Sequence, residues 1–296
     1  MAPPPASEGD GEQVATQTVR PAARRSVSPP RSAEHERPPR YLLLWRLAGY
    51  VLFVGGWMAL SAFVFQSGFE GEATLLPAPI SVLREMWEIV QGGDFWVNVL
   101  ATLKHLAIGF LLAFVIGTTI GIAMGRSPYW NGFFSDYVML TLTTPGLVFA
   151  LICVMIFGLA GIGPIVAIVL TSFPHITVNV VEGVRAIPRD LMDMATAYGV
   201  PRSTRIRNIV LPAVAPFLFT AVRYGFAIAW KITALTELFG GADGVGIQIR
   251  VEYQFFDIGG VLAWAFFLVG FALIMERLVL QRLEQRFFRW RPKAFV

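Results

Sequence analysis

Six long apolar stretches dominate the chain after residue 40. Each is close to the ~20 residues that a helix needs to cross the hydrocarbon layer of a membrane. The stretches lie at about 47–66, 98–124, 134–157, 162–182, 214–238 and 260–281. They predict an all-α membrane protein with six transmembrane helices, in one domain that covers residues 41–296.

The first 40 residues lack this pattern and are rich in Pro, Ala, Ser, Glu and Arg. Such a composition cannot bury enough apolar surface to offset chain entropy. Arg24-Arg25 resembles a twin-arginine export signal, but the first apolar stretch starts too far downstream and is too long for one. We predict that residues 1–40 are a disordered cytoplasmic tail.

The composition agrees with a membrane protein. Of the 296 residues, 55% are hydrophobic and 15% are charged, whereas a soluble domain carries about 25% charged residues. The single cysteine, Cys153, excludes a disulfide within the chain. His35, His105 and His175 are scattered, so no metal site is expected. The net charge of +4 comes from arginines beside apolar spans, so no nucleic-acid partner is expected.

Basic residues alternate in abundance between successive loops, which predicts the orientation. With a cytoplasmic N-terminus, the inner segments hold seven arginines before residue 47, Arg126, five arginines in 183–213 and five basic residues after 281. The outer segments hold only Arg84 and Arg250. Because basic loops stay inside, we predict that both termini and residues 183–213 are cytoplasmic.

Two smaller patterns predict packing. Gly117, Gly121 and Gly125 recur every four residues, so one helix face allows close approach of another backbone. Residues 76–90 open with prolines and continue with apolar positions at helical spacing. This second pattern predicts an amphipathic helix on the outer membrane surface.

The loop 183–213 combines helix formers with deliberately placed helix breakers. Pro188 ends the preceding helix, and residues 189–198 predict a short helix with an apolar side. Gly199 tolerates positive φ and Pro201 confirms the stop. A second short helix over 202–210 follows, and Pro212 suits the first turn of the next span.

The predicted helix–turn–helix has two interpretations. Its apolar side consists of Leu191, Met192, Met194, Ala195 and Tyr198. An apolar face with small side chains that points into water favours docking into a groove of another protein. Packing of the same face against the chain's own membrane helices is the alternative.

The spacing within this loop resembles the EAA loop of bacterial ABC importer permeases. That pattern is Glu-Ala-Ala, three residues, Gly, nine residues, Ile, one residue and Leu-Pro. The matching residues are Asp193, Ala195, Gly199, Ile209, Leu211 and Pro212. Asp193 replaces the glutamate and Met194 replaces the first alanine.

The resemblance extends over nearly the whole chain after residue 40, toward the nitrate/sulfonate/taurine branch of that family. The stretches that carry it lie at 76–83, 109–125, 173–184, 229–240 and 283–291. "TLTTPGLVFA" at 141–150 departs from the proline-rich pattern expected there, which puts the substrate in doubt.

The resemblance implies a type I importer permease, in which the loop between spans 4 and 5 carries the coupling helix. Two permease copies, usually a homodimer, would form the pathway in the bacterial cytoplasmic membrane. Separate ABC ATPase subunits would bind ATP and Mg²⁺, and an extracytoplasmic binding protein would deliver substrate. The coupling residues would be Asp193, Met194, Ala195, Gly199, Ile209, Leu211 and Pro212. Asp193 would meet a basic or N–H group of the ATPase, and Gly199 would set the angle between the short helices.

The chain has no Gly-Lys dipeptide and hence no phosphate-binding Walker A loop. We therefore expect a non-catalytic subunit that binds no cofactor itself.

Arg223, Lys231 and Glu237 are charged positions within the fifth span and are the expected pathway residues. Arg223 and Glu237 share a face but lie ~21 Å apart along the helix, too far to pair. Lys231, near mid-membrane, is expected to favour an anionic substrate such as a sulfonate, nitrate or carboxylate. Neutralisation by a carboxylate of a neighbouring span is the alternative for Lys231.

Other readings of the polar residues remain open. Lys104 fits a side chain that snorkels to the outer interface better than a ligand, and His175 fits a hydrogen-bonded helix residue. An ion-gradient-driven transporter would use Lys231, Glu237 and His175 as a relay, but no internal repeat supports one. An intramembrane enzyme would need a convergent catalytic set, which the scattered histidines and one cysteine do not form.

Overall fold

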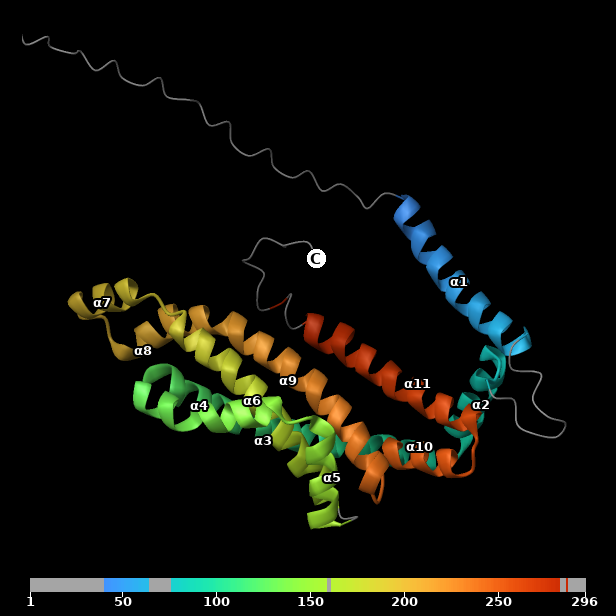
Figure 1. Cartoon of the computed structure of the whole chain (residues 1–296). Helices are drawn as coiled ribbons and strands as arrows, with labels where there is room; N and C mark the ends of the chain where they lie inside the picture. The colour runs from blue at the N-terminus through green and yellow to red at the C-terminus, as the bar shows by residue number, and fades with distance from the viewer. Residues whose placement is uncertain (1–39, 64–75, 159–160, 283–285, 287–296) are drawn as a thin grey trace, which may run out of the picture. The chain divides into compact units, whose positions relative to one another are not determined.

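The computed structural model describes residues 40–63, 76–158, 161–282 and 286, and in these ranges every regular element is a helix (Figure 1). The predicted disordered tail lies outside the described residues, apart from Arg40. The stretch 283–291 also lies outside them, apart from Arg286. The chain divides into two compact units, Met1–Val51 and Leu52–Val296. The description below concerns the second unit unless it names α1.

The helices follow one another along the chain with short connections. They are α1 (Arg40–Phe63), α2 (Pro79–Gln91), α3 (Asp94–Arg126), α4 (Pro128–Thr143), α5 (Gly146–Phe157), α6 (Ile162–Arg185), α7 (Arg189–Ala197), α8 (Arg202–Arg205), α9 (Leu211–Gly240), α10 (Val245–Gln254) and α11 (Ile258–Ile274). Two π-helical segments, η1 (Ile206–Val210) and η2 (Met275–Leu280), join α8 to α9 and extend α11.

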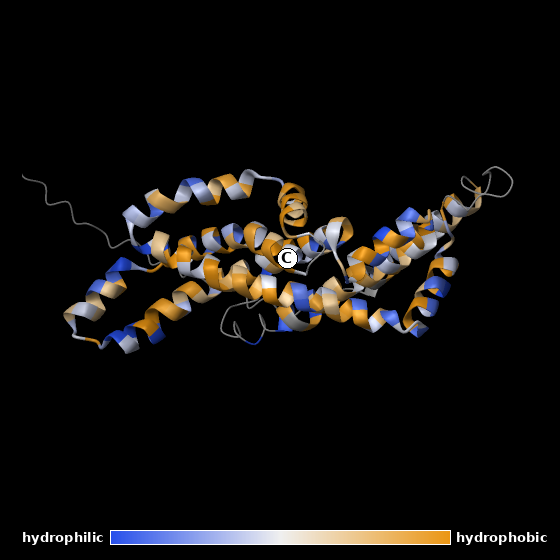
Figure 2. Ribbon diagram, turned by 90° about the horizontal axis from the view of Figure 1, so that it is seen from below, coloured by the Kyte–Doolittle hydropathy of each residue, from blue (hydrophilic) through white to orange (hydrophobic). Residues whose placement is uncertain are grey.

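Five helical segments of the described ranges are long and apolar enough to cross a membrane. They are Leu44–Phe63, Asp94–Arg126, Ile162–Arg185, Arg202–Gly240 and Ile258–Leu278. A sixth span is obtained if α4 and α5 count as one broken span. Apolar residues dominate these long helices, and hydrophilic residues gather mainly in short helices and at helix ends (Figure 2).

The predicted span 134–157 is not one straight helix, which corrects the sequence-based expectation. Its two halves, α4 and α5, are bent by 94°. Thr144 and Pro145, between them, have extended ψ angles of 126° and 132°. Proline lacks an N–H and disfavours helical geometry in the residue before it. The Thr-Pro-Gly sequence at 144–146 therefore breaks the span.

The helices α3, α6 and α9 run side by side and form the centre of the unit (Figure 1). The predicted glycine stripe of α3 packs on α6, as expected. A Cβ on Gly117 would lie 2.7 Å from the Phe173 carbonyl oxygen, and one on Gly121 would lie 2.7 Å from Val180 Cβ. Thr177 Oγ1 donates to the Gly117 carbonyl at 3.2 Å. In lipid, such close backbone contact replaces the hydrophobic effect as a source of helix association.

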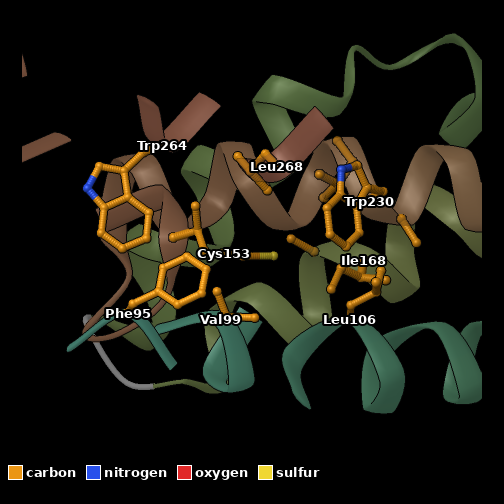
Figure 3. Packing of buried hydrophobic residues seen from close by; sticks show 12 residues of the cluster. Phe95, Val99, Leu106, Cys153, Ile168, Trp230, Trp264 and Leu268 are labelled. Carbon is orange, nitrogen blue, oxygen red and sulfur yellow. The ribbon is translucent and has the colours of Figure 1, made fainter. Parts of the chain in front are cut away.

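A cluster of large apolar side chains fills the space around this centre. Ile168 of α6 lies between Leu106 of α3 and Trp230 of α9, and Trp264 and Leu268 of α11 belong to the same cluster (Figure 3). Ile168 is completely buried. The cluster fixes α3, α6, α9 and α11 relative to one another.

The predicted amphipathic helix at 76–90 is confirmed as α2. Val82 is buried, whereas Ile80, Leu83 and Trp87 are 69%, 59% and 64% exposed. The segment before α2 is tied to α1 by Ser61 Oγ, which donates to the Leu76 carbonyl at 2.8 Å. An exposed apolar side suits a helix lying at a membrane surface, and that location stays a prediction.

Candidate functional site

The short helix α7 ends in a glycine cap that explains Gly199. Gly199 has φ +64°, which an L side chain adopts only with strain. The Val200 N–H donates to the Ala195 carbonyl at 2.9 Å, and the Gly199 N–H donates to the Thr196 carbonyl at 3.0 Å. This pair of bonds is a Schellman motif. The sequence-based assignment of the turn at Gly199 is confirmed.

The chain reverses after this cap and continues as α8, forming an α7–α8 hairpin over residues 189–205 (Figure 1). Arg205 Nη1 donates to Thr196 Oγ1 at 2.8 Å and holds the two short helices together. The expected separate helix over 202–210 is wrong in one respect. α8 runs through η1 into α9 without a break, so that residues 202–240 form a continuous helical segment. Pro212 does not interrupt it, because the first turn of α9 needs no N–H at that position.

One side of the hairpin is apolar and exposed. Leu191, Met194 and Tyr198 are 43%, 52% and 83% exposed, and Asp193 is exposed beside them. Ala195, in contrast, is only 5% exposed. The chain itself covers Ala195, so this alanine supports the hairpin from within.

The remaining residues of the motif lie along η1 and the start of α9. Ile209 and Pro212 are half-buried, and Leu211 is 54% exposed. With Met194 and Tyr198 they leave an uncovered apolar surface, which we call the hairpin surface. Both interpretations made from the sequence hold for different residues: Ala195 packs inward and the others face outward.

A second feature is a pocket at the α4–α5 break, which we call the break pocket. Its volume is about 380 Å³. It is lined by residues 141–147 of the break, by Thr171 and His175 of α6, and by a stretch of α9 from Ile228 to Leu235 that includes Lys231. The stretch "TLTTPGLVFA", which departs from the family pattern, thus supplies much of the lining.

The three predicted pathway residues do not meet. Arg223 Nη2 lies 2.6 Å from Glu276 Oε1 in η2, and Glu237 lies toward the far end of α9. Lys231 alone lines the break pocket. It is exposed, and none of the ion pairs found among the described residues involves it. The alternative of a neutralising carboxylate from a neighbouring span therefore finds no support there.

Glu237 is fully buried at 0% exposure and its carboxylate is surrounded by donors. Thr102 Oγ1 donates to Oε2 at 2.8 Å, the Gly246 N–H donates to Oε2 at 3.1 Å, and His105 Nδ1 lies 3.0 Å from Oε1. Thr102 also accepts from the Val245 N–H at 2.8 Å. The network joins α3, the end of α9 and the start of α10, and a buried carboxylate of this kind is stable only with such partners.

Three carboxylates gather at the junction of α2, α10 and α11. Burial, together with the charges of Asp257 and Glu88, raises the pKa of Glu85 above its usual value. Burial, with Asp257 and Glu85, likewise raises the pKa of Glu252. Asp257 caps α11 by accepting from the Gly259 and Gly260 N–H groups at 2.9 and 3.2 Å. We call Glu85, Glu252 and Asp257 the acidic corner.

The remaining polar residues agree with their sequence-based interpretations. His175 Nδ1 lies 3.0 Å from the Thr171 carbonyl, one turn earlier in α6, so His175 is a hydrogen-bonded helix residue. Lys104 is exposed on α3, as a snorkelling side chain would be.

Sequence reasoning missed α10, the network around Glu237 and the Arg223–Glu276 pair. The histidine and threonine of the network lie 132 and 135 residues from Glu237. The available signal was their placement four and seven residues after Asn98 on one face of the second span. Asn98 joins them by accepting from the Gly244 N–H at 3.1 Å.

Comparison with known proteins follows the same lines as the geometry. The chain is 26% identical over 219 residues to the putative aliphatic sulfonates transport permease protein SsuC of Bacillus subtilis, covering 74% of this chain and 79% of that protein. It is 28% identical over 269 residues to the bicarbonate transport system permease protein CmpB of Synechococcus elongatus, covering 86% and 94%. A chain of the MetNI methionine ABC transporter, solved in an inward-facing conformation, shares the fold with a TM-score of 0.54 at 20% identity, covering 71% of this chain and 99% of that one.

The family comparison covers most of the membrane domain. Residues 96–289 match the family described as "Binding-protein-dependent transport system inner membrane component". The match begins in α3 and includes the hairpin surface, the break pocket and the Glu237 network. It gives no support to the ion-gradient alternative, and the chain belongs to this family of transport permeases.

Proposed function

We propose that this chain is the membrane-spanning permease subunit of an ATP-driven importer for small anions, and that it docks a separate ATPase through the hairpin surface. The observation that carries the proposal is the hairpin itself. It presents Met194 and Tyr198 to solvent at the spacing of the EAA loop, next to the rigid cap at Gly199. An exposed apolar surface of this kind favours a protein partner.

The long helix through α9 suits transmission of force from that surface. Residues 202–240 would be about 58 Å long at 1.5 Å per residue, about twice the ~30 Å hydrocarbon layer. If the end near Gly240 lies at the outer membrane surface, residues 202–220 project on the cytoplasmic side. A movement of the hairpin would then reach Lys231 and the break pocket along one continuous helix.

The partners and cofactors follow from this role. ABC ATPase subunits would bind ATP and Mg²⁺, an extracytoplasmic binding protein would supply substrate, and a second permease copy would complete the pathway. The chain itself would hold no cofactor. The anionic substrate class is supported by the sulfonate and bicarbonate relatives and by Lys231.

A pull-down from the native host tests the proposal. The tagged chain is purified in mild detergent, its partners are identified, and ATP hydrolysis by the complex is measured. We expect an ATPase subunit and a binding protein to co-purify. A chain that is isolated without an ATPase, and whose transport survives ATP depletion, would refute the proposal.

A matched pair of glycine variants assigns the contact to the hairpin. Gly199 and Gly158 both have positive φ, +64° and +65°, and a Cβ would meet nothing within 4 Å at either position. Gly199→Ala and Gly158→Ala therefore add the same backbone strain, about 1 kcal/mol, at different places. Only Gly199→Ala is expected to weaken ATPase retention. Equal weakening by both variants would show that the hairpin has no special part in docking.

A further inference from the structure

The break pocket contains a cation without a counter-charge. Lys231 is the only Asp, Glu, Lys or Arg residue among those that line it, and it lies nine residues before the end of α9. That distance is about 14 Å along the helix, close to the middle of a ~30 Å membrane layer. An ammonium group at that depth is costly unless water or an anion compensates its charge. The pocket therefore favours a negatively charged occupant.

The other polar groups of the pocket restrict where an anion can be bound. Thr144 Oγ1 donates to the Leu140 carbonyl at 2.8 Å, and Thr171 Oγ1 donates to the Ala167 carbonyl at 2.7 Å. Thr141 and Thr143 likewise donate to carbonyls of α4. These hydroxyl protons are occupied by the chain's own backbone. The donors left for an anion are Lys231 and the first N–H groups of α5, which have no partner within the helix.

The rest of the lining is apolar. Leu142 and Leu147 lie on the side of the break, and Ile228, Ile232 and Leu235 lie on the side of α9. An inorganic anion such as nitrate or bicarbonate carries charge on all of its oxygens. Some of those oxygens would face apolar side chains without a hydrogen bond, which is unfavourable. An anion with one charged end and one apolar end matches both parts of the pocket.

We propose that the break pocket binds an organic oxyanion with a short apolar chain, its sulfonate or carboxylate group at Lys231 and its chain against Ile228, Ile232 and Leu235. This inference rests on the proposed importer function and names the substrate class within it. Lys231 is then a specificity-determining residue for the transported anion.

Protection of an introduced cysteine tests the site directly and needs no binding protein. Thr143→Cys places a thiol at an exposed position of the pocket lining, while Cys153, the chain's only cysteine, is 2% exposed. The permease, with its co-purified ATPase, is placed in nanodiscs. Its labelling by the uncharged reagent methyl methanethiosulfonate is timed in ethanesulfonate, butanoate or nitrate at equal ionic strength. Leu147→Cys provides a second, independent label across the pocket.

We expect ethanesulfonate or butanoate to slow labelling by about tenfold at about ten times its dissociation constant, because only free sites react. The stronger of the two identifies the preferred charged group. Lys231→Met should abolish the protection and Lys231→Arg should retain it. Lys104→Met, which removes an exposed lysine of α3 outside the pocket, should leave it unchanged.

Three results would overturn the inference: no protection by either organic anion, protection that survives Lys231→Met, or equal protection by nitrate. The last would assign an inorganic anion to the same lysine. Failure of the proposed function shows itself differently, as the absence of an ATPase in the pull-down. In that case the same labelling is done on the permease alone and still reports on the pocket.

Discussion

Two charged residues of α9, Lys231 and Glu237, lie less than two helical turns apart and have opposite surroundings. Glu237 is fully buried and its carboxylate contacts Thr102, His105 and the Gly246 N–H. Lys231 is exposed to the break pocket, and no ion pair of the described residues includes it. One charge is therefore completed by the fold, while the other is left for something that the fold does not supply.

The difference teaches how to separate structural from functional charges in a membrane helix. Donors from α3 and from the turn after α9 converge on Glu237 and fix that end of the helix. Removing a partner of a buried charge is strongly destabilising. Removing an exposed cation that has no partner costs little stability, so an effect of Lys231 on transport would report on function.

The largest effect is expected for Glu237→Ala. The substitution leaves His105, Thr102 and the Gly246 N–H without their common acceptor, and should cost about 3–5 kcal/mol of stability. Thermal unfolding of the purified complex measures it, with Glu237→Gln as the variant that keeps the side-chain shape. An unfolding temperature unchanged by Glu237→Ala would show that the network carries no stability.

A smaller loss is expected for Thr102→Val, which keeps the shape of the side chain. It removes the donor to Glu237 and the acceptor of the Val245 N–H. Two buried groups lose a partner, so that we expect a loss of about 1–3 kcal/mol. Thr143→Val is the matched control, because its exposed hydroxyl bonds only to its own helix. A loss as large for Thr143→Val would deny the network a special role.

Lys231→Met is expected to leave the unfolding temperature nearly unchanged and to reduce uptake of an anionic substrate by about tenfold, the value of one contact worth about 1.4 kcal/mol. Uptake into proteoliposomes that hold the complete importer is the measurement. Lys231→Arg should keep most of the activity, since it keeps the charge. Unchanged uptake with Lys231→Met would end the assignment of this residue to the pathway.

The smallest effect concerns the acidic corner, an intermediate case in which carboxylates face like charges. The pKa values of Glu85 and Glu252 are raised in the folded state above 4.5. The folded chain then binds more protons than the unfolded chain, so that stability falls as pH rises from about 4.5 through the raised values. Hydrogen exchange of α2 and α10 at pH 5 and pH 7 should show faster opening at pH 7.

Glu85→Gln provides the control for this pH dependence. It removes one of the like charges, so the difference between pH 5 and pH 7 should shrink. If the wild-type chain instead becomes more protected as pH rises, the sign of the effect, and with it the account of the corner, is wrong.

Local patterns were sufficient to predict several features of the structure. Hydropathy located the spans to within several residues, and the breakers around Gly199 located the cap of α7. The glycine stripe of α3 predicted close contact with another helix. Each of these features depends on residues near one another in the chain, where spacing and backbone chemistry act directly.

The break within the third predicted span shows where local patterns mislead. Average hydropathy over 134–157 is that of one helix, and it hides the effect of Pro145 on Thr144. The angle of 94°, and the pocket beside it, come from the way α5 packs against α6 and α9. A sequence window contains no information about that packing.

The sequence by itself determined that the chain is an all-helical membrane protein with a capped polar hairpin between two spans, because hydropathy, glycine and proline act over a few residues. Only the tertiary structure decided the surroundings of the charges of α9. The partners of Glu237 come from residues more than 130 positions away, and the walls around Lys231 come from α4, α5 and α6. Such groups meet only when the helices have packed, because burial and hydrogen bonding depend on distances in space.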